Sequence, residues 1–559
     1  MPVPYHAATS RRAVLRACAV AFLLFVVLFW RLGSPTFWDP DEAHYAESSR
    51  ELIRTGDWLA PHYNEQPFFD KPILFHWLQG TTMTLFGPTE FGARLISALG
   101  ALAIIITTAW LGTTLVSFEV GFVAALVFSA SPAVFALARY AILDTVFTAF
   151  LFGGVSLVTV AALKDRPRLQ WSGYVLIALA VLTKGPLALA LCGLTFGLAL
   201  LASAELRRRL LALRIVTGLA IVLAISAPWF LYMYVRFRGD FINGYLMDEN
   251  IRLFATNRFR ARTDLWFYFR VLGAGLLPWT GLVLGRMFDD ARRLIRDREL
   301  DPVETLLWCW TVAVVGFFTF SRFKLDHYVF PAAPALCLLC ARAWADVRAQ
   351  TLARLSAGVR VGFQTVGPIL VVIGAGGGYF MVARLELPSG AIVVPVLLLV
   401  AGAVITALAS LGDLRAPRVP WIALTACVIT YAGIIVWVMP ALEQHKVVDD
   451  IAKWVARSAP AESRVGLYRL NRWSNSFRFY VDRHAAHLER IEEARAFLEK
   501  PGPFYCVMLG PIYDEFVAQG LPLQLVYERD GMWATSGRAL WRRRIPPTRF
   551  VVVSRKMSP

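Results

Sequence analysis

The chain contains repeated long apolar runs, and these constrain its fold more than any other feature. A helix that crosses a bilayer needs about 20 mostly apolar residues, and thirteen stretches have that character. An apolar run can cross hydrocarbon as a helix because its backbone groups bond to one another. We therefore expect a polytopic α-helical membrane protein with about 13 transmembrane helices. The expected spans are 13–31, 92–115, 118–137, 145–163, 171–183, 186–203, 211–236, 268–286, 302–320, 328–346, 364–383, 391–411 and 419–440.

Composition agrees with this class. The chain is 57% hydrophobic and only 17% charged, whereas soluble domains carry about 25% charged residues. Six of the seven cysteines lie in apolar runs, where cysteine behaves as a small hydrophobe. No disulfide framework is therefore expected.

The net charge of +17 invites a nucleic-acid interpretation, but the positive charge is sorted by loop. With the N-terminus in the cytoplasm, the inside loops are rich in arginine, which is the positive-inside pattern. This sorting argues against nucleic acid as a partner and places the C-terminal tail outside. The basic residues at the inside loops are Lys164, Arg166, Arg168, Arg207–Arg209, Arg292, Arg293, Arg296, Arg298, Arg342, Arg348, Arg354, Arg360, Arg415 and Arg418.

The first outer loop, 32–91, is crowded with ionisable residues. Charged groups beside a bilayer are costly unless they are wet or paired, so such a cluster indicates a functional site. Helical spacing predicts helices over 41–52 and 73–85, and Pro40 suits a helix start. The alternative is a cap on the membrane surface without chemistry.

Asp41, Glu42 and Asp144 are the candidate catalytic residues. A carboxylate can act as a general base toward an acceptor. Since neighbours on a helix point in different directions, we expect at most one of Asp41 and Glu42 to act directly. The alternative is that both favour a helix N-terminus, and Asp39 is expected to be a capping or turn residue. Asp144 either holds a nearby cation, shares the acceptor with Asp41, or caps the fourth span.

Cations in the outer loops run against the positive-inside trend. An anionic ligand at the outer face would explain them, and lysine suits phosphate as a point charge. The alternatives are solvated loop charges and, for tyrosine, membrane-interface behaviour. The candidates for binding a donor phosphate or headgroup are Lys71, Arg139, Arg252, Arg258, Lys324 and Tyr328.

After Pro440 the chain becomes polar, with short apolar runs between helical patterns. This alternation predicts a soluble α/β domain over 441–559, after a membrane domain over 1–440. The expected strands lie near 465–470, 504–509, 523–527 and 550–553, with a helix near 491–498. The histidines lack a tight ligand spacing, so no metal site is expected.

Several motifs together resemble the bacterial C-type (GT-C) glycosyltransferases that use polyprenyl-phosphate sugars, in particular the aminoarabinose lipid A transferase family, which is related to protein O-mannosyltransferases. The matching residues are Asp41-Glu42-x-x-Tyr45-Ala46-Glu47, Gly56-Asp57-Trp58, Tyr63-Asn64, Phe69-Asp70-Lys71-Pro72, Arg139, Asp144, Thr183-Lys184-Gly185-Pro186 and Lys324-Leu325-x-x-Tyr328-x-x-Pro331.

The resemblance implies sugar transfer at the periplasmic face of the bacterial inner membrane. The donor would be a sugar on undecaprenyl phosphate, with aminoarabinose the leading sugar, and the acceptor lipid A or a related envelope glycolipid. It implies no cofactor. Asp41 resembles the catalytic carboxylate, Lys71 the donor phosphate ligand and Tyr328 a headgroup contact. The family often reads Asn-Leu-x-Arg-Phe where this chain has 250–254 with the arginine one position earlier, so either Arg252 or Arg258 is the expected phosphate clamp.

Two alternatives stay open. One is transfer to protein hydroxyl groups by the same fold. The other, from a different class, is a lipid flippase or transporter. Transporters carry ionisable residues near the membrane midplane, whereas here the spans are nearly free of them and the charges gather at one face. That distribution favours an outer-face enzyme.

Overall fold

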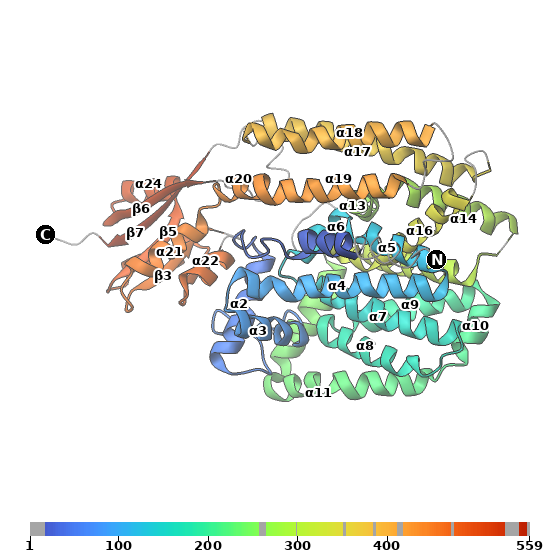
Figure 1. The fold of residues 1–559 in the computed structure, drawn as a ribbon. Helices are drawn as coiled ribbons and strands as arrows, with labels where there is room; N and C mark the ends of the chain where they lie inside the picture. The colour runs from blue at the N-terminus through green and yellow to red at the C-terminus, as the bar shows by residue number, and fades with distance from the viewer. Residues whose placement is uncertain are drawn as a thin grey trace, which may run out of the picture.

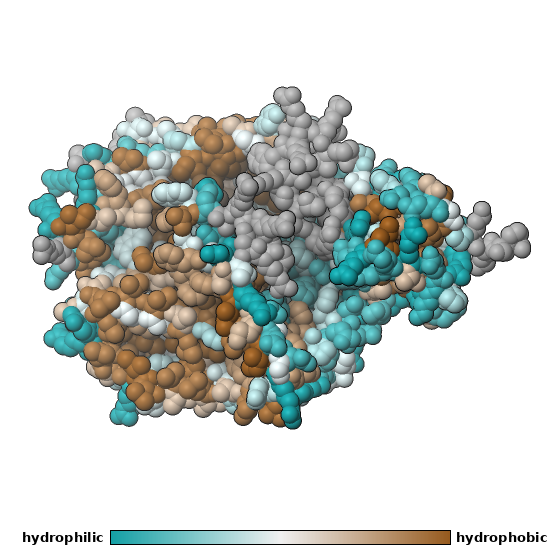
Figure 2. All heavy atoms as spheres, turned by 180° about the vertical axis from the view of Figure 1, so that it is seen from behind, coloured by the Kyte–Doolittle hydropathy of each residue, from teal (hydrophilic) through white to brown (hydrophobic). Residues whose placement is uncertain are grey.

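The computed structural model describes residues 17–256, 264–297, 299–349, 354–383, 387–410, 418–470, 474–531 and 547–555. Most of this chain forms a bundle of long helices, and a small sheet with its own helices lies at one end of the bundle (Figure 1). Figure 2 shows apolar residues covering much of the helical bundle, whereas hydrophilic residues dominate the visible surface of the sheet domain.

The bundle begins with the apolar helix Ala17–Phe29. Its first half is then α2 (Asp41–Thr55), α3 (Leu74–Phe86), α4 (Glu90–Leu115), α5 (Phe118–Ser129), α6 (Pro132–Ala138), α7 (Asp144–Leu163), α8 (Leu169–Lys184), α9 (Leu187–Ala202), α10 (Ala204–Leu211) and α11 (Ile215–Phe241). Its second half is η2 (Ile242–Arg252), α12 (Leu253–Ala255), α13 (Phe267–Gly275), α14 (Thr280–Asp297), α15 (Pro302–Phe320), η3 (Asp326–Ala332), α16 (Ala333–Ala349), α17 (Ala357–Ala383), α18 (Val393–Ser410), α19 (Val419–Gly433) and α20 (Met439–Glu443).

Within the described residues, eight helices are long and apolar enough to cross a membrane, or nine if α5 and α6 form one bent span. Three further apolar helices are shorter, namely Ala17–Phe29, α8 and α9. The multi-span helical class predicted from the sequence is confirmed. The predicted number of thirteen is not.

Two predicted spans are broken. The stretch 118–137 forms α5 and α6 at 63° to one another, and α6 begins with Pro132, which has no backbone N–H to continue a helix. The stretch 268–286 is divided between α13 and α14, with Pro278 in the connection. A proline explains the helix break in both places. Hydrophobic periodicity alone does not predict such a break.

The first outer loop forms the two helices that its spacing predicts, α2 and α3. They lie at the end of the bundle nearest the sheet, whereas α10, which carries Arg207–Arg209, lies at the opposite end (Figure 1). The acidic loop and the arginine-rich helix are thus at opposite ends of the bundle.

The C-terminal sheet is mixed and has the order β4-β3-β5-β7-β6. Strand β3 (Arg464–Tyr468) pairs in parallel with β4 (Ala486–Leu488) and β5 (Phe504–Leu509). Strand β7 (Thr548–Arg555) pairs antiparallel with β5 and with β6 (Leu523–Gly531). The accompanying helices are α21 (Val448–Ser458), α22 (Ser474–Val481), α23 (Ile491–Glu499) and α24 (Gly510–Ala518). The predicted α/β character is confirmed, and every element of this domain lies after Pro440.

Candidate active site

Asp41 opens helix α2, with Pro40 at the N-cap position. It lines a cavity of about 230 Å³ together with side chains from the loop before α3, from α7, α8 and η2, and from the start of η3. The segments that supply these side chains run from Asp41 to Tyr328 in the sequence. The lining residues are Asp41, His44, Tyr45, Phe68, Asp70, Lys71, Ile142, Leu143, Asp144, Lys184, Glu249, Leu253, Phe323, Leu325, His327 and Tyr328.

Lys71 lines the cavity and pairs with Asp70, the residue before it in the sequence. Its ammonium lies 2.5 Å from Asp70 Oδ1 and 3.9 Å from Glu249 Oε2. Tyr45 donates a hydrogen bond of 3.2 Å to the other oxygen of Asp70. Asp70 is therefore held from two sides, and it holds Lys71 in turn.

A second lysine faces the same space. Lys184, at the end of α8, lies 2.5 Å from Asp144 Oδ1, at the start of α7. The second oxygen of Asp144 lies 3.7 Å from His327 Nε2. The Lys184 ammonium also lies 4.8 Å from the centre of the Tyr328 ring, within the range of a cation–π contact. Asp144 thus holds a cation, as one of its predicted roles requires.

An apolar groove of about 460 Å³ adjoins this cavity. The cavity and the groove share Lys71, Lys184 and Tyr328, so the two lysines stand where the polar and apolar spaces meet. The groove is otherwise lined mainly by apolar residues of α9, η2, α12 and α15, and these are Leu187, Ala190, Leu246, Ile251, Leu253, Phe254, Ala255, Phe317 and Phe318.

The pKa values of Asp41 and Asp70, two carboxyl groups of the outer loop, are shifted in opposite directions. Burial raises the pKa of Asp41 above its ordinary value of 3.8; His327 opposes this effect, and the carboxylates of Asp70 and Asp144 add to it. Burial acts on Asp70 in the same sense, but the adjacent Lys71 ammonium outweighs it, so the pKa of Asp70 falls below its usual range. The two carboxyl groups are thus shifted in opposite directions, the pKa of Asp70 downward by its lysine and that of Asp41 upward by burial.

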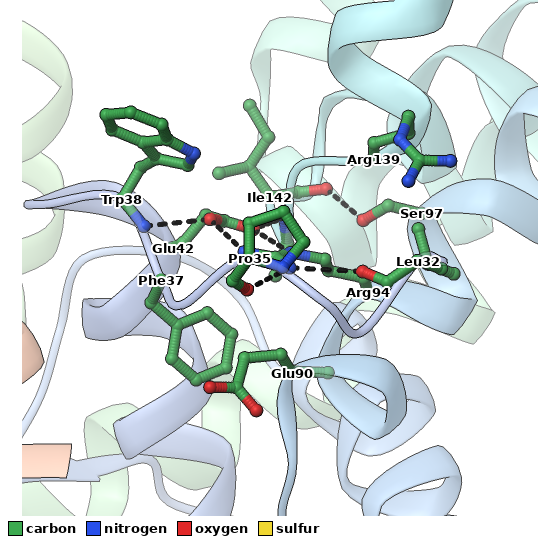
Figure 3. Close-up of polar contacts among 12 residues, drawn as sticks. Leu32, Pro35, Phe37, Trp38, Glu42, Glu90, Arg94, Ser97, Arg139 and Ile142 are labelled. Atoms are coloured by element: carbon green, nitrogen blue, oxygen red, sulfur yellow. Dashed lines mark hydrogen bonds and ion pairs between the residues drawn. The ribbon is translucent and has the colours of Figure 1, made fainter. Parts of the chain in front are cut away.

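Glu42 does not line this cavity. It is fully buried, and its two oxygens receive Arg94 Nε and Nη2 at 2.7 and 2.8 Å. The backbone N–H groups of Trp38 and Ala141 also donate to it. Figure 3 shows this carboxylate enclosed by Arg94 and the backbone. As expected for adjacent helical positions, Asp41 and Glu42 point into different surroundings.

The structure brings only some of the predicted cations to the cavity, and Arg258 lies outside the described residues. Arg139 instead donates to the carbonyls of Trp30 and Arg31 at 2.8 and 3.2 Å. Arg252 is exposed and pairs with Asp248 at 2.7 Å. Lys324 is buried, donates to the Asp264 carbonyl at 3.1 Å, and lies between two residues that do line the cavity, Phe323 and Leu325.

Lys184, Glu249 and His327 also line the cavity, although the sequence assigned none of them a catalytic or phosphate-binding role by number. Lys184 carried a signal, because it is a cation between two apolar runs on the outer side. His327 lies within the motif that supplied Lys324 and Tyr328. Glu249 gave no signal beyond its place in a charged loop. Among the described residues, no group of three or more His, Cys, Asp or Glu side chains is arranged to hold a metal ion.

Comparisons with known proteins find relatives for part of this chain. A family model described as dolichyl-phosphate-mannose-protein mannosyltransferase matches residues 70–232. An undecaprenyl phosphate-alpha-4-amino-4-deoxy-L-arabinose arabinosyl transferase of Sodalis glossinidius is 33% identical over 380 residues. That match covers 66% of this chain and 65% of the relative, just under two thirds of its length. The Pectobacterium atrosepticum protein of the same description is 30% identical, over 65% of this chain and 66% of its own.

Over 65–66% of its length, the chain is thus similar to proteins described as undecaprenyl phosphate-aminoarabinose arabinosyl transferases.

Solved structures extend the likeness to nearly the whole fold. The crystal structure of ArnT from Cupriavidus metallidurans matches with a TM-score of 0.72 and 22% identity, over 98% of each chain. The same protein bound to undecaprenyl phosphate gives the same values. An Archaeoglobus fulgidus oligosaccharyltransferase matches with a TM-score of 0.51 and 12% identity, over 89% of this chain and 69% of its own. At these identities the structures show a shared fold, including the sheet domain that the family model does not reach.

Proposed function

We propose that the protein is an integral-membrane glycosyltransferase that moves 4-amino-4-deoxy-L-arabinose from undecaprenyl phosphate to lipid A or a related envelope glycolipid. One observation carries the proposal: Asp41, Lys71 and Lys184 line a single polar cavity that adjoins an apolar groove. This pairing of spaces suits a ligand with a charged head and a hydrocarbon tail. Bacterial inner-membrane placement, with the cavity and the sheet domain on the periplasmic side, belongs to the same proposal.

The donor would lie with its phosphate at the junction of the two spaces. Lys71 and Lys184 are the cations there, and a lysine ammonium binds phosphate oxygens as a compact charge. The prenyl chain would follow the groove past Phe254, Phe317 and Phe318, because burial of apolar surface is favourable. The sugar would then occupy the polar cavity, next to Asp41.

The transfer needs one bond made and one broken at the anomeric carbon. An oxygen of the acceptor attacks that carbon, and the bond from the carbon to the phosphate oxygen breaks, with its electron pair leaving on undecaprenyl phosphate. Asp41 accepts the proton when the attacking oxygen carries one. Lys71 and Lys184 stabilise the negative charge that develops on the phosphate, in a partly buried site where such contacts are strong.

Asp70 and Asp144 serve this arrangement as anchors. Each places a lysine ammonium at the cavity through a contact of 2.5 Å. We propose a structural role for Glu42, whose oxygens are both engaged by Arg94. A headgroup contact stays proposed for Tyr328, which lines both spaces.

The test uses the purified full-length chain in detergent, with undecaprenyl-phosphate aminoarabinose as donor and lipid A as acceptor. Asp41→Asn keeps the shape of the side chain but removes its basicity, so turnover should be abolished while undecaprenyl phosphate still binds. Asp240→Asn is the matched control, because Asp240 is an exposed carboxylate of α11 that lines neither the cavity nor the groove, and it should retain full turnover. Wild-type turnover by Asp41→Asn would overturn the assignment.

Transfer to protein hydroxyl groups is the second candidate, and the description of the matched family model favours it. The same assay with serine- and threonine-containing peptides in place of lipid A separates the two. Lipid A modified and peptide untouched supports the first proposal, and the reverse result supports the second. Movement of the donor across vesicle membranes without any sugar transfer would support a transporter instead.

A further inference from the structure

The C-terminal domain grips the segment that leads into Asp41. The carboxylate of Asp39 accepts a hydrogen bond of 2.7 Å from the backbone N–H of Ser476 and another from the Ser476 hydroxyl. Ser476 lies in the first turn of α22, where free N–H groups and the helix dipole favour an anion. Asp39 is therefore the capping residue that the sequence predicts, but it caps a helix of the other domain. It stands two positions before Asp41.

A second set of contacts holds the residues just before Asp39. The backbone N–H of Phe37 donates to the Tyr480 hydroxyl at 2.9 Å, and that hydroxyl donates to Glu90 of α4 at 2.7 Å. The Lys446 ammonium lies 2.9 Å from the carbonyls of both Thr36 and Phe37. The C-terminal domain thus forms hydrogen bonds with the backbone of residues 36 and 37, and these bonds restrict the conformation of the segment before Asp41.

The same helix α22 also lies along α2. Arg50 of α2 donates to the Phe479 carbonyl at 2.7 Å. Arg478 of α22 reaches Glu51 and Glu47 of α2 at 3.2 and 3.5 Å. Arg478 is only 2% exposed and Glu47 fully buried, so this interface excludes water. Its ion pairs fix the rotation of α2 relative to α22 because a buried charge is stable only when it is paired.

The bundle also holds this segment, through Arg94 of α4. Its guanidinium donates to the carbonyls of Leu32, Pro35 and Thr36 at 2.7–3.1 Å, as Figure 3 shows for the first two. The helix start at Pro40 makes no side-chain capping bond of its own. Within the first turn of α2, Glu42 is held by Arg94 and the Ala141 N–H, and the segment just before Asp41 is held by the C-terminal domain. The Asp41 carboxylate stands between these two sets of contacts.

We propose that the C-terminal domain is a positioning element for the reaction, and that the Asp39–Ser476 contact holds the Asp41 carboxylate at the cavity. The inference rests on the proposed function, in which Asp41 is the catalytic carboxylate. Neither Asp39 nor Ser476 lines the cavity, so they act through Asp41 rather than on the substrate. A displacement of about 1 Å in a catalytic group can cost about 100-fold in rate, which makes such a contact consequential.

The test compares Ser476→Ala and Asp39→Ala in the full-length protein, with the donor and acceptor named above. Each should lower kcat about tenfold, leave the KM for the donor within about twofold, and leave binding of undecaprenyl phosphate unchanged. The double variant should lose no more than the worse single variant, since both changes remove one shared contact. Ser458→Ala is the matched control, because Ser458 is an exposed serine at the end of α21 in the same domain, and it should keep the wild-type kcat.

Tyr480→Phe tests a second contact between the C-terminal domain and the segment before Asp41. It keeps the proposal testable if either of the first variants fails to fold. It keeps the ring and removes only the hydroxyl that joins Phe37 to Glu90, and it should lower kcat with the KM unchanged. If Asp41→Asn is inactive while Ser476→Ala, Asp39→Ala and Tyr480→Phe keep the wild-type kcat, the positioning role is overturned and the proposed function stands. If Asp41→Asn turns over normally, the proposed function itself fails.

Discussion

Charged residues gather at both ends of the helical bundle, and the two clusters are built differently. At the end near the sheet, Lys71 and Lys184 each rest on one close carboxylate beside a cavity. At the other end, Arg286 of α14 contacts Asp290, Glu304 and Asp346 at once. Helix α15 joins the two regions: Glu304 is in its first turn and Phe317 lines the groove, and the rise of 1.5 Å per residue separates them by about 20 Å.

The choice of side chain follows the task of each cluster, and buried arginines such as Arg94 also serve as joints at the end near the sheet. An arginine fork satisfies several acceptors in fixed directions, which suits a closed structural joint. Arg342 and Arg293 extend that joint to Glu304 and Asp290, and Glu304 is fully buried. A lysine is a mobile point charge that can turn from its carboxylate toward a ligand oxygen. Lysines beside a cavity therefore indicate binding, whereas buried arginines shared among acids indicate architecture.

Removing the hub of the structural cluster should give the largest effect. Arg286→Met leaves the carboxylates of Asp290 and Glu304 buried with part of their partners gone, and breaking a buried ion pair costs about 3–5 kcal/mol. We expect a clear fall in the thermal unfolding midpoint in detergent, with wild-type turnover per folded molecule. The matched control is Arg296→Met, since Arg296 on the same helix is exposed. An unchanged unfolding midpoint for Arg286→Met would contradict a structural role for the arginine cluster.

Removing a cavity lysine should affect catalysis instead. Lys71→Gln takes away the charged contact that we propose to the donor phosphate. Such a contact is worth about 1.5–3 kcal/mol, which corresponds to a loss of about 10- to 150-fold in kcat/KM. Because the change also leaves Asp70 without its close cation, the unfolding midpoint should fall, but by less than in Arg286→Met, since Glu304 is fully buried whereas Asp70 borders a cavity. Kinetics and thermal unfolding measured on the same preparation check both statements. A variant that unfolds early but retains kcat/KM would make Lys71 a structural residue like Arg286.

The pH profile should report Asp41. Since burial raises its pKa above 3.8, the carboxylate gains its proton at a higher pH than an exposed aspartate would as the solution is acidified. A general base works only when deprotonated, so kcat/KM should rise with pH through this raised pKa and fall up to about tenfold per unit below it. A profile flat down to the ordinary aspartate range would contradict a base in this environment.

Substitution of Arg252 should have the smallest effect, and it tests whether this residue belongs to the phosphate site. It is exposed and pairs with Asp248 one helical turn away, and exposed pairs contribute about 0.2–1 kcal/mol. Arg252→Gln should therefore change kcat/KM and the unfolding midpoint only slightly, by less than about fivefold in the former. A loss as large as that of Lys71→Gln would restore Arg252 as the phosphate clamp that the sequence motif suggests.

Sequence patterns predicted those features that depend on local order. Hydrophobic runs predicted the multi-span bundle, spacing predicted α2 and α3, and apolar stretches after Pro440 predicted β3, β5, β6 and β7. For the site, Asp41, Lys71, Asp144 and Tyr328 were predicted and do share one cavity. Their catalytic and binding roles stay predictions.

Other features depend on contacts between residues far apart in the sequence, and sequence patterns did not predict them. Glu42 and Asp41 are adjacent and chemically alike, yet only the packing of Arg94, 52 positions away, makes one of them an enclosed anchor. Arg139 was predicted to bind phosphate, but it donates to two carbonyls at the end of the first helix. The breaks at Pro132 and Pro278 divided two spans that periodicity treats as continuous.

The sequence by itself determined that this chain has many apolar spans, that its charges are sorted between two ends, and that an α/β region follows. Those properties come from hydrophobicity and local backbone preferences, which act between near neighbours. Only the tertiary structure decided which charges meet, because an ion pair or a cavity depends on side chains brought together from distant segments. That is why Lys184 joined the site, why Arg252 stayed outside it, and why Asp39 caps a helix more than 400 residues away.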